Sequence, residues 1–173
     1  LSVSGFQQMQ AIEADGFFYV DQKIKLAMHS WLPGRSWPGA TLNVNLSWRE
    51  PGDWPSSLAV FVHLRRESTL LAQADGVPHF FYLYDFSNGG MPQETLDEWR
   101  QLTVPIDAQP GETLTVVIGL YNPQTGQRAD VLDANGNVIG NEVVIGQVQV
   151  GLPPVPDQAC ALIAATCAAQ PVQ

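Results

Sequence analysis

Residues Thr113–Tyr121 read Thr-Leu-Thr-Val-Val-Ile-Gly-Leu-Tyr, and the segment Asn-Pro-Gln-Thr-Gly follows directly. Apolar side chains occupy every second position, which is the pattern of a strand with one face in a core. The Pro and Gly residues that follow favour a turn. The rest of the chain repeats this unit of alternating segment and turn, so the pattern favours an antiparallel β protein.

Several other segments have the features of strands. Residues 41–48 alternate most clearly, with apolar side chains on one face and polar ones on the other. Residues 59–64 carry bulky side chains on both faces, which predicts a central strand. Pro105 has no N–H for a ladder, so residues 101–106 are expected at a sheet edge or a strand end. Further strands are predicted at residues 24–28, 70–74 and 142–150, and at 17–20, either separate from 24–28 or joined to it.

About eight strands with short turns, and no crossover helices, predict an all-β fold: an antiparallel two-sheet β-sandwich of jelly-roll or Greek-key type. The number of strands does not distinguish jelly-roll connections from immunoglobulin-like ones. A length of 173 residues suits one domain. We expect an N-terminal arm at residues 1–15, the sandwich at 16–150, and a Pro-rich linker with a short Ala-rich tail at 151–173.

Charge and hydropathy exclude some partners. The 17 acidic and 8 basic side chains give a net charge of −9, so a nucleic acid partner is not expected. No apolar run approaches the ~20 residues of a membrane span, and the first residues do not resemble a signal peptide. We expect a soluble chain, either a mature product or a piece of something membrane-bound. Few charges with many Pro and Gly residues are common in exported β domains, which favours an extracytoplasmic location.

The two cysteines, Cys160 and Cys167, both lie in the tail. If residues 161–169 are helical, a rise of ~1.5 Å per residue separates the two Cα atoms by about 10 Å, too far for a disulfide. A helix and an internal disulfide therefore exclude each other. The alternatives are a disulfide in a non-helical loop, which requires an oxidising compartment, and two free or buried thiols.

Two motifs together resemble a known domain. They are Val-Phe-Val-His-Leu at residues 60–64 and Gly-Leu-Tyr-Asn-Pro-Gln-Thr-Gly at 119–126, accompanied by Pro-Gly-Glu-Thr at 110–113. They resemble the C-terminal, extracytoplasmic β-sandwich of bacterial membrane glycosyltransferases of the protein-mannosyltransferase type, over roughly residues 17–150. The resemblance implies an accessory module outside the cytoplasm. In that family the transferase chemistry lies in the membrane portion, and no such segment is present in this sequence.

Catalytic motifs are not found. His29, His63 and His79 are scattered without metal-ligand spacing, so no metal site is expected. His63 lies on a predicted central strand, which favours a hydrogen-bonded structural role. Asp97 and Glu98 are adjacent, and consecutive strand residues point to opposite faces, unlike a glycosidase pair. The sequence also lacks a nucleophile elbow and a phosphate loop, so we expect neither an enzyme nor a cofactor.

The loop from Asp133 to Asn137 reads Asp-Ala-Asn-Gly-Asn, with the alternating oxygen ligands that begin a calcium-binding EF-hand. Val144 stands where the twelfth-position Glu would be needed. A tight Asn-Gly turn explains the same residues, and this is the interpretation we favour.

Aromatic residues are the best candidates for binding. Trp31, Trp37 and Trp54 lie in or beside Pro/Gly loops, and Tyr82 and Tyr84 share one face if residues 80–84 are extended. Exposed Trp and Tyr side chains stack on sugar rings or anchor protein interfaces. Alternatively, these rings cap the ends of the sandwich core.

These features predict a non-catalytic interaction or structural subunit of a cell-envelope or membrane-associated assembly. Its partners would be other protein subunits, of the same or another kind, joined through the tails or an exposed strand edge. The alternative is a carbohydrate-binding accessory module that uses the Trp and Tyr residues, with glycans as partners.

Overall fold

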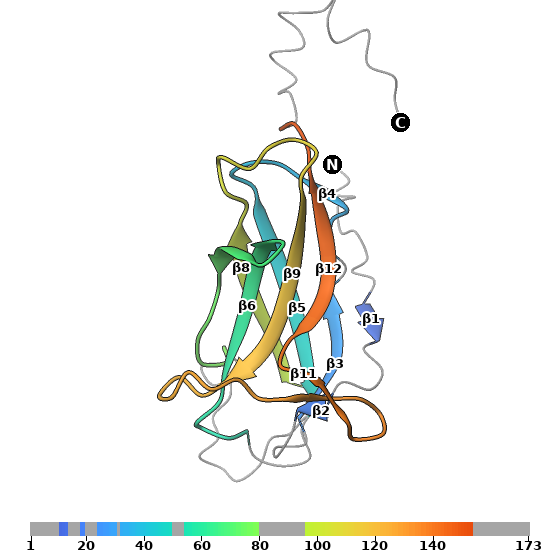
Figure 1. The fold of residues 1–173 in the computed structure, drawn as a ribbon, viewed down its shortest axis with the longest axis vertical. Coiled ribbons are helices and arrows are strands. Elements are labelled where there is room, and N and C mark those ends of the chain that lie inside the picture. The colour runs from blue at the N-terminus through green and yellow to red at the C-terminus, as the bar shows by residue number, and fades with distance from the viewer. Residues whose placement is uncertain are drawn as a thin grey trace, which may run out of the picture.

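The computed structural model describes residues 11–13, 18–19, 24–30, 32–49, 54–79 and 96–153. These residues form twelve strands and no helix. The strands make a seven-stranded and a five-stranded sheet, which pack face to face as two layers (Figure 1). The prediction of an all-β, two-sheet antiparallel sandwich is confirmed. Most of the predicted arm and tail lies outside the described residues.

The seven-stranded sheet is antiparallel at every pairing. Its longest ladder joins two strands without a register shift, from Thr41 opposite Thr103 to Trp48 opposite Leu96. In spatial order the strands are β11 (Val138–Gly140), β10 (Val131–Leu132), β2 (Phe18–Tyr19), β3 (Lys25–Ser30), β5 (Thr41–Arg49) and β8 (Leu96–Thr103), with β1 (Ala11–Glu13) paired to β3.

The five-stranded sheet contains one parallel pair. Gln149 lies opposite Arg35 and Val150 opposite Ser36, so the last strand of the sheet runs beside a short early one. The other pairs are antiparallel. In spatial order the strands are β4 (Arg35–Ser36), β12 (Val143–Val150), β9 (Thr113–Tyr121), β6 (Ala59–Arg66) and β7 (Thr69–Gln73).

Most strand predictions agree with the structure. Strand β9 has the predicted bounds, and β5 extends the predicted segment by one residue. Strand β6 lies between β9 and β7 and is buried on both faces over Ala59–Leu64, as a central strand should be. The segment expected to hold one strand or two contains two, β2 and β3, and β3 continues to Ser30.

Strand β8 differs from the prediction, because it spans Leu96–Thr103 and not residues 101–106. Pro105 lies in the turn that follows, where its carbonyl accepts a hydrogen bond from the Ala108 N–H at 3.1 Å. Pro105 therefore lies just beyond the end of the strand, in agreement with the predicted strand end. Among the described residues β8 also pairs only with β5, which places it at the sheet edge.

The core lies between the two sheets. Every second side chain of β5 points inward and is buried, as are the matching positions of β8, β9 and β12. Burial of this apolar area stabilises the fold by roughly 25 cal/mol per Å² removed from water. The largest fully buried apolar side chains between the sheets are Trp48, Ile24, Leu26, Leu42, Leu46, Leu64, Leu102, Leu114 and Ile118.

Candidate functional site

Two of the predicted aromatic residues have very different environments. Trp37 follows β4 in a turn and is 40% exposed. Trp54 is only 4% exposed; its ring packs edge-on against Trp48, with centroids 5.7 Å apart, and its indole N–H donates to the Leu58 carbonyl at 3.2 Å. Trp54 therefore caps the core, the second of the two predicted roles, and its ring is not available to a ligand.

The remaining predicted site residues cannot be placed in the fold. The aromatic candidates Trp31, Tyr82 and Tyr84 lie outside the described residues, and so do Cys160 and Cys167.

Three large apolar side chains are exposed at one end of the sandwich, and we call this group the apolar pole. It consists of Trp37, Ile106, which is 82% exposed, and Leu152, which is 76% exposed. The loops that carry these residues gather at the end where β12 stops, at the top of Figure 1. Ile106 was expected to continue an alternating strand, and its exposure follows from the early end of β8.

Backbone hydrogen bonds hold the loops of the apolar pole together. The Gly39 N–H donates to the Val104 carbonyl at 2.9 Å, which joins the turn after Trp37 to the chain just before Ile106. The Gly151 N–H donates to the Ser36 carbonyl at 2.7 Å. Leu152 therefore follows directly from a residue fixed beside Trp37.

Strand β8 carries a buried ion pair on its core side. Glu98 and Arg100 lie two residues apart and so face the same way, and both are buried. The Arg100 Nε–H donates to Glu98 Oε1 at 2.6 Å. Its Nη2 group also donates to the carbonyls of Gly76 and Val77, at 3.1 and 2.9 Å. Arg100 thus joins the edge strand to the segment after β7.

The pKa of Glu98 reflects this environment. Burial raises its pKa above the usual value, because the charged form loses water. The charge and hydrogen bond of Arg100 oppose that shift, as do the His79 backbone and the Trp48 side chain. The adjacent Asp97 is exposed on the opposite face, so the two carboxylates do not form the acid and base of a glycosidase.

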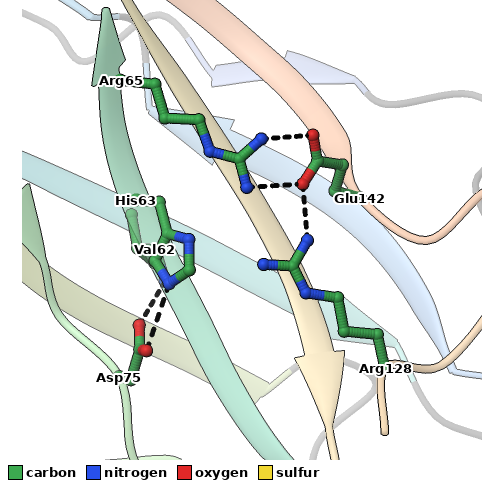
Figure 2. Close-up of polar contacts among 6 residues, drawn as sticks. All are labelled: Val62, His63, Arg65, Asp75, Arg128 and Glu142. Atoms are coloured by element: carbon green, nitrogen blue, oxygen red, sulfur yellow. Dashed lines mark hydrogen bonds and ion pairs between the residues drawn. The ribbon is translucent and has the colours of Figure 1, made fainter. Parts of the chain in front are cut away.

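A second network lies on the outer face of the five-stranded sheet (Figure 2). Glu142 accepts hydrogen bonds from Arg65 at 2.6 and 2.8 Å and from Arg128 at 2.7 Å. Partial burial alone would raise the pKa of Glu142, but the bonds and charges of the two arginines outweigh it and lower that pKa below its usual value. The Arg128 guanidinium also lies 4.3 Å from the centroid of the Phe61 ring, an attractive cation–π arrangement.

His63 belongs to the same outer face. Its Nε2 lies 3.1 Å from Asp75 Oδ2, while Asp75 Oδ1 accepts the Val62 N–H at 3.3 Å (Figure 2). The predicted hydrogen bond of His63 is therefore present, and its partner is the Asp75 carboxylate. Burial, and then the charge of Asp75, raise the pKa of Tyr121. The contacts of Asp75 with His63 and with the Val62 N–H fix the segment after β7 against β6.

The loop after β10 is closed by its own residues. The Asp133 carboxylate accepts the backbone N–H groups of Asn135 and Asn137, both at 2.8 Å, and the Asn137 side-chain N–H. The side-chain and backbone bonds from Asn137 lower the pKa of Asp133. Gly136 has φ +83°, which favours glycine. The arrangement is a tight turn between β10 and β11, as predicted.

One exposed face has the chemistry of a binding surface, and we call it the Trp99 face. It is formed by the outward side chains of β5 and β8, with Trp99 53% exposed. Asn45 lies opposite Trp99 across the two strands. Two hydrogen-bonded pairs flank it: Ser47 Oγ–H donates to Asp97 at 2.5 Å, and the Gln101 amide donates to Asn43 at 3.0 Å.

Sequence reasoning did not select Trp99, because the search for exposed aromatics favoured Pro/Gly loops. A usable signal was present. Leu96 and Leu102 are apolar and lie an even number of positions apart, so both point to the same face of a strand. Trp99 lies an odd number of positions from each of them, which predicts that it points to the opposite, outer face. The inward Glu98 and Arg100 concealed this alternation.

Comparisons with known proteins add no assignment. No protein-family model and no curated protein matches this chain. In the described part of the chain, no three or more His, Cys, Asp or Glu side chains gather as a metal ion would require. Nor do those residues include a helix with the length and apolarity of a membrane span.

Proposed function

We propose that this chain is a non-catalytic interaction or structural subunit of an extracytoplasmic assembly at the cell envelope or a membrane. The observation that carries the proposal is the apolar pole, with Trp37, Ile106 and Leu152 exposed together. Scattered apolar side chains on a surface need no explanation, whereas a group of them marks an interaction site.

The partner proposed for the apolar pole is the C-terminal segment of a neighbouring copy. Residues 159–169 read Ala-Cys-Ala-Leu-Ile-Ala-Ala-Thr-Cys-Ala-Ala and carry no charge, so they are chemically suited to an apolar surface. The segment follows Leu152 after a short stretch that contains three prolines, and prolines favour an extended spacer. The proposal requires this spacer to carry the segment to the neighbouring copy.

This pairing joins two different surfaces, the pole of one copy and the tail of the next. Contacts of this head-to-tail kind produce rings or open filaments when each copy binds the tail of a different neighbour. The proposal therefore specifies an assembly of more than two copies, in keeping with a structural subunit.

The extracytoplasmic setting is supported by the low charge content and by the resemblance to the accessory domain of membrane glycosyltransferases. In that setting the domain contributes contacts, while chemistry belongs to a membrane-embedded partner. Its net charge of −9 favours solubility of the isolated domain.

Light scattering on the purified chain tests this proposal. We expect a mass several times 18.9 kDa for the full chain, and a monomer when residues 154–173 are deleted. The double substitution Ile106→Ser with Leu152→Ser should also give a monomer. Val138→Ser is the matched control, since Val138 is exposed on β11, away from the apolar pole.

A full-length chain that remains monomeric over the concentrations tested would overturn the proposal. So would an assembly that persists after the tail is deleted. If Val138→Ser dissolves the assembly while Ile106→Ser with Leu152→Ser does not, the interface lies at β11 and the apolar pole is not the docking site.

A further inference from the structure

The Trp99 face lies on a side of the sandwich that the proposed assembly does not use. Trp99 extends from β8 and exposes about half of its surface. An indole is the largest apolar side chain, and solvent exposure to this extent leaves unfavourable apolar area in water. The exposed ring is therefore a natural place for a ligand with a flat apolar surface.

His79 holds the Trp99 ring in place. The two ring centroids are 4.9 Å apart, and His79 Nδ1 lies 2.7 Å from the Trp99 carbonyl oxygen. One side of the indole is thus supported by protein while the rest faces solvent. A ring that is already ordered loses little conformational freedom when a ligand binds, which favours affinity.

The surroundings of Trp99 are polar but nearly uncharged. Apart from Asp97 on β8 and the exposed Arg49 at the end of β5, the outward positions of the two strands carry amides and hydroxyls: Thr41, Asn43, Asn45, Ser47, Gln101 and Thr103. Asp97 is the one carboxylate among the outward positions of β8, and it accepts the Ser47 hydroxyl. Amides and hydroxyls both donate and accept hydrogen bonds.

A neutral sugar matches this combination. A pyranose ring presents a flat C–H face that stacks on an aromatic ring, and hydroxyls at its edge that pair with amides. The outward side chains form a row along the adjacent antiparallel strands β5 and β8, which offers contacts to successive sugar units. Anionic glycans fit poorly, because the net charge of the chain is −9 and repels them.

We propose that the Trp99 face binds a neutral polysaccharide, with one sugar ring stacked on Trp99 and neighbouring hydroxyls bonded to Asn43 and Gln101. This site differs from the loop aromatics expected from the sequence. It is independent of the apolar pole, so either proposal can fail without the other.

Affinity electrophoresis in native gels tests the proposal. The gels contain α-mannan, galactomannan, mixed-linkage β-glucan or arabinoxylan, and a polyuronate serves as the anionic control. We expect at least one neutral polysaccharide to retard the chain, and the polyuronate not to. Trp99→Ala should weaken that binding about tenfold or more, because it removes the stacking surface.

Three further variants separate stacking from folding. Trp99→Phe keeps an aromatic ring and should retain part of the binding, and Gln101→Ala should weaken it a few-fold. Trp37→Ala, at the apolar pole, should bind as the parent chain does. Thermal unfolding of each variant confirms that the exposed positions leave the fold intact.

The proposal is overturned if no neutral polysaccharide in the panel retards the chain, or if Trp99→Ala is retarded as strongly as the parent. It is also overturned if Trp99→Ala changes only the mass seen by light scattering, since the Trp99 face would then be a protein interface.

Discussion

Glu98 and Arg100 form an ion pair inside the sandwich although both belong to its edge strand, β8. Charged side chains at inward positions of an edge strand are costly to bury, and they are tolerated when each is paired and hydrogen-bonded. Here Arg100 meets that requirement by bonding both to Glu98 and to two carbonyls of the segment after β7. The pair therefore joins the two sheets at their edge.

The first prediction concerns this ion pair. Arg100→Met should reduce the free energy of unfolding by about 3–5 kcal/mol, because it leaves Glu98 buried without its partner. Replacing both residues, with Glu98→Leu and Arg100→Met, should cost less than Arg100→Met alone. Urea denaturation measures all of these values.

Asp97→Asn is the control for the ion pair, because Asp97 lies on the exposed face of the same strand. It should change the free energy of unfolding by less than about 0.5 kcal/mol. An Arg100→Met variant as stable as the parent would show that the pair does not hold the edge strand.

The second prediction is a pH dependence from Glu142. Its pKa is lowered in the folded state from a usual value near 4.5, so folding favours its charged form. The stability it contributes is present above the unfolded pKa and is lost as the pH falls through the folded pKa. Glu142→Gln should therefore lower stability at pH 7 and flatten the loss of stability on acidification.

Glu98 should act in the opposite direction. Its pKa is raised in the folded state, so its contribution is greatest below the unfolded pKa and is lost as the pH rises through the folded pKa. Denaturation curves collected across acidic and neutral pH distinguish the stability contribution of Glu98 from that of Glu142, because the two are lost in opposite directions of pH. Equal pH slopes for the parent and Glu142→Gln would contradict the role of Glu142.

The third prediction concerns Gly119 on β9, which lies beneath the Phe61 ring. A Cβ atom at Gly119 would overlap that ring and would lie 3.1 Å from the Asn141 carbonyl. Gly119→Ala should thus destabilise the fold by about 1–3 kcal/mol through overpacking. Adding Phe61→Leu should recover part of this loss if the ring is the obstacle.

Gly34→Ala provides the matched control for Gly119, because nothing lies within 4 Å of a Cβ at Gly34. Its expected effect on the melting temperature is close to zero. Similar losses for Gly34→Ala and Gly119→Ala would indicate a backbone effect instead of a contact with Phe61.

The fourth prediction compares Trp54 and Trp37, the two tryptophans predicted as binding candidates that lie among the described residues. Trp54→Ala should cost about 3–5 kcal/mol, since its ring is part of the core. Trp54→Phe should recover part of that cost. Trp37→Ala should cost much less, because Trp37 is substantially exposed. Chemical denaturation gives both values, and a stable Trp54→Ala variant would contradict the capping role.

Local patterns in the sequence predicted the strands whose faces are chemically distinct. Strands β5 and β9 alternate apolar and polar side chains because each has one face in the core. The start of strand β8 was predicted at residue 101 instead of Leu96. The reason is that Glu98 and Arg100 occupy inward positions, where the pattern of alternating apolar residues would require apolar side chains. A paired charge in a core leaves no signal in hydropathy.

The candidate surfaces were harder to predict than the strands. Trp37 was a candidate for either an exposed ring or a cap on the core, and it is exposed. Its proximity to the other residues of the apolar pole depends on loops far apart in the chain. Arg65 and Glu142 are likewise 77 positions apart, and no local pattern relates them. Tertiary pairing, rather than residue type, decides which exposed side chains share a surface.

The place of β12 between β4 and β9 has a consequence for biosynthesis. An N-terminal part of the chain that stops before Val143 lacks an interior strand and leaves the pairing edge of β9 open. The domain therefore completes its second sheet only after nearly all of its residues have left the ribosome. Contacts between distant segments close slowly, so the nascent chain exposes an unpaired edge during that interval, when it depends most on protection from aggregation.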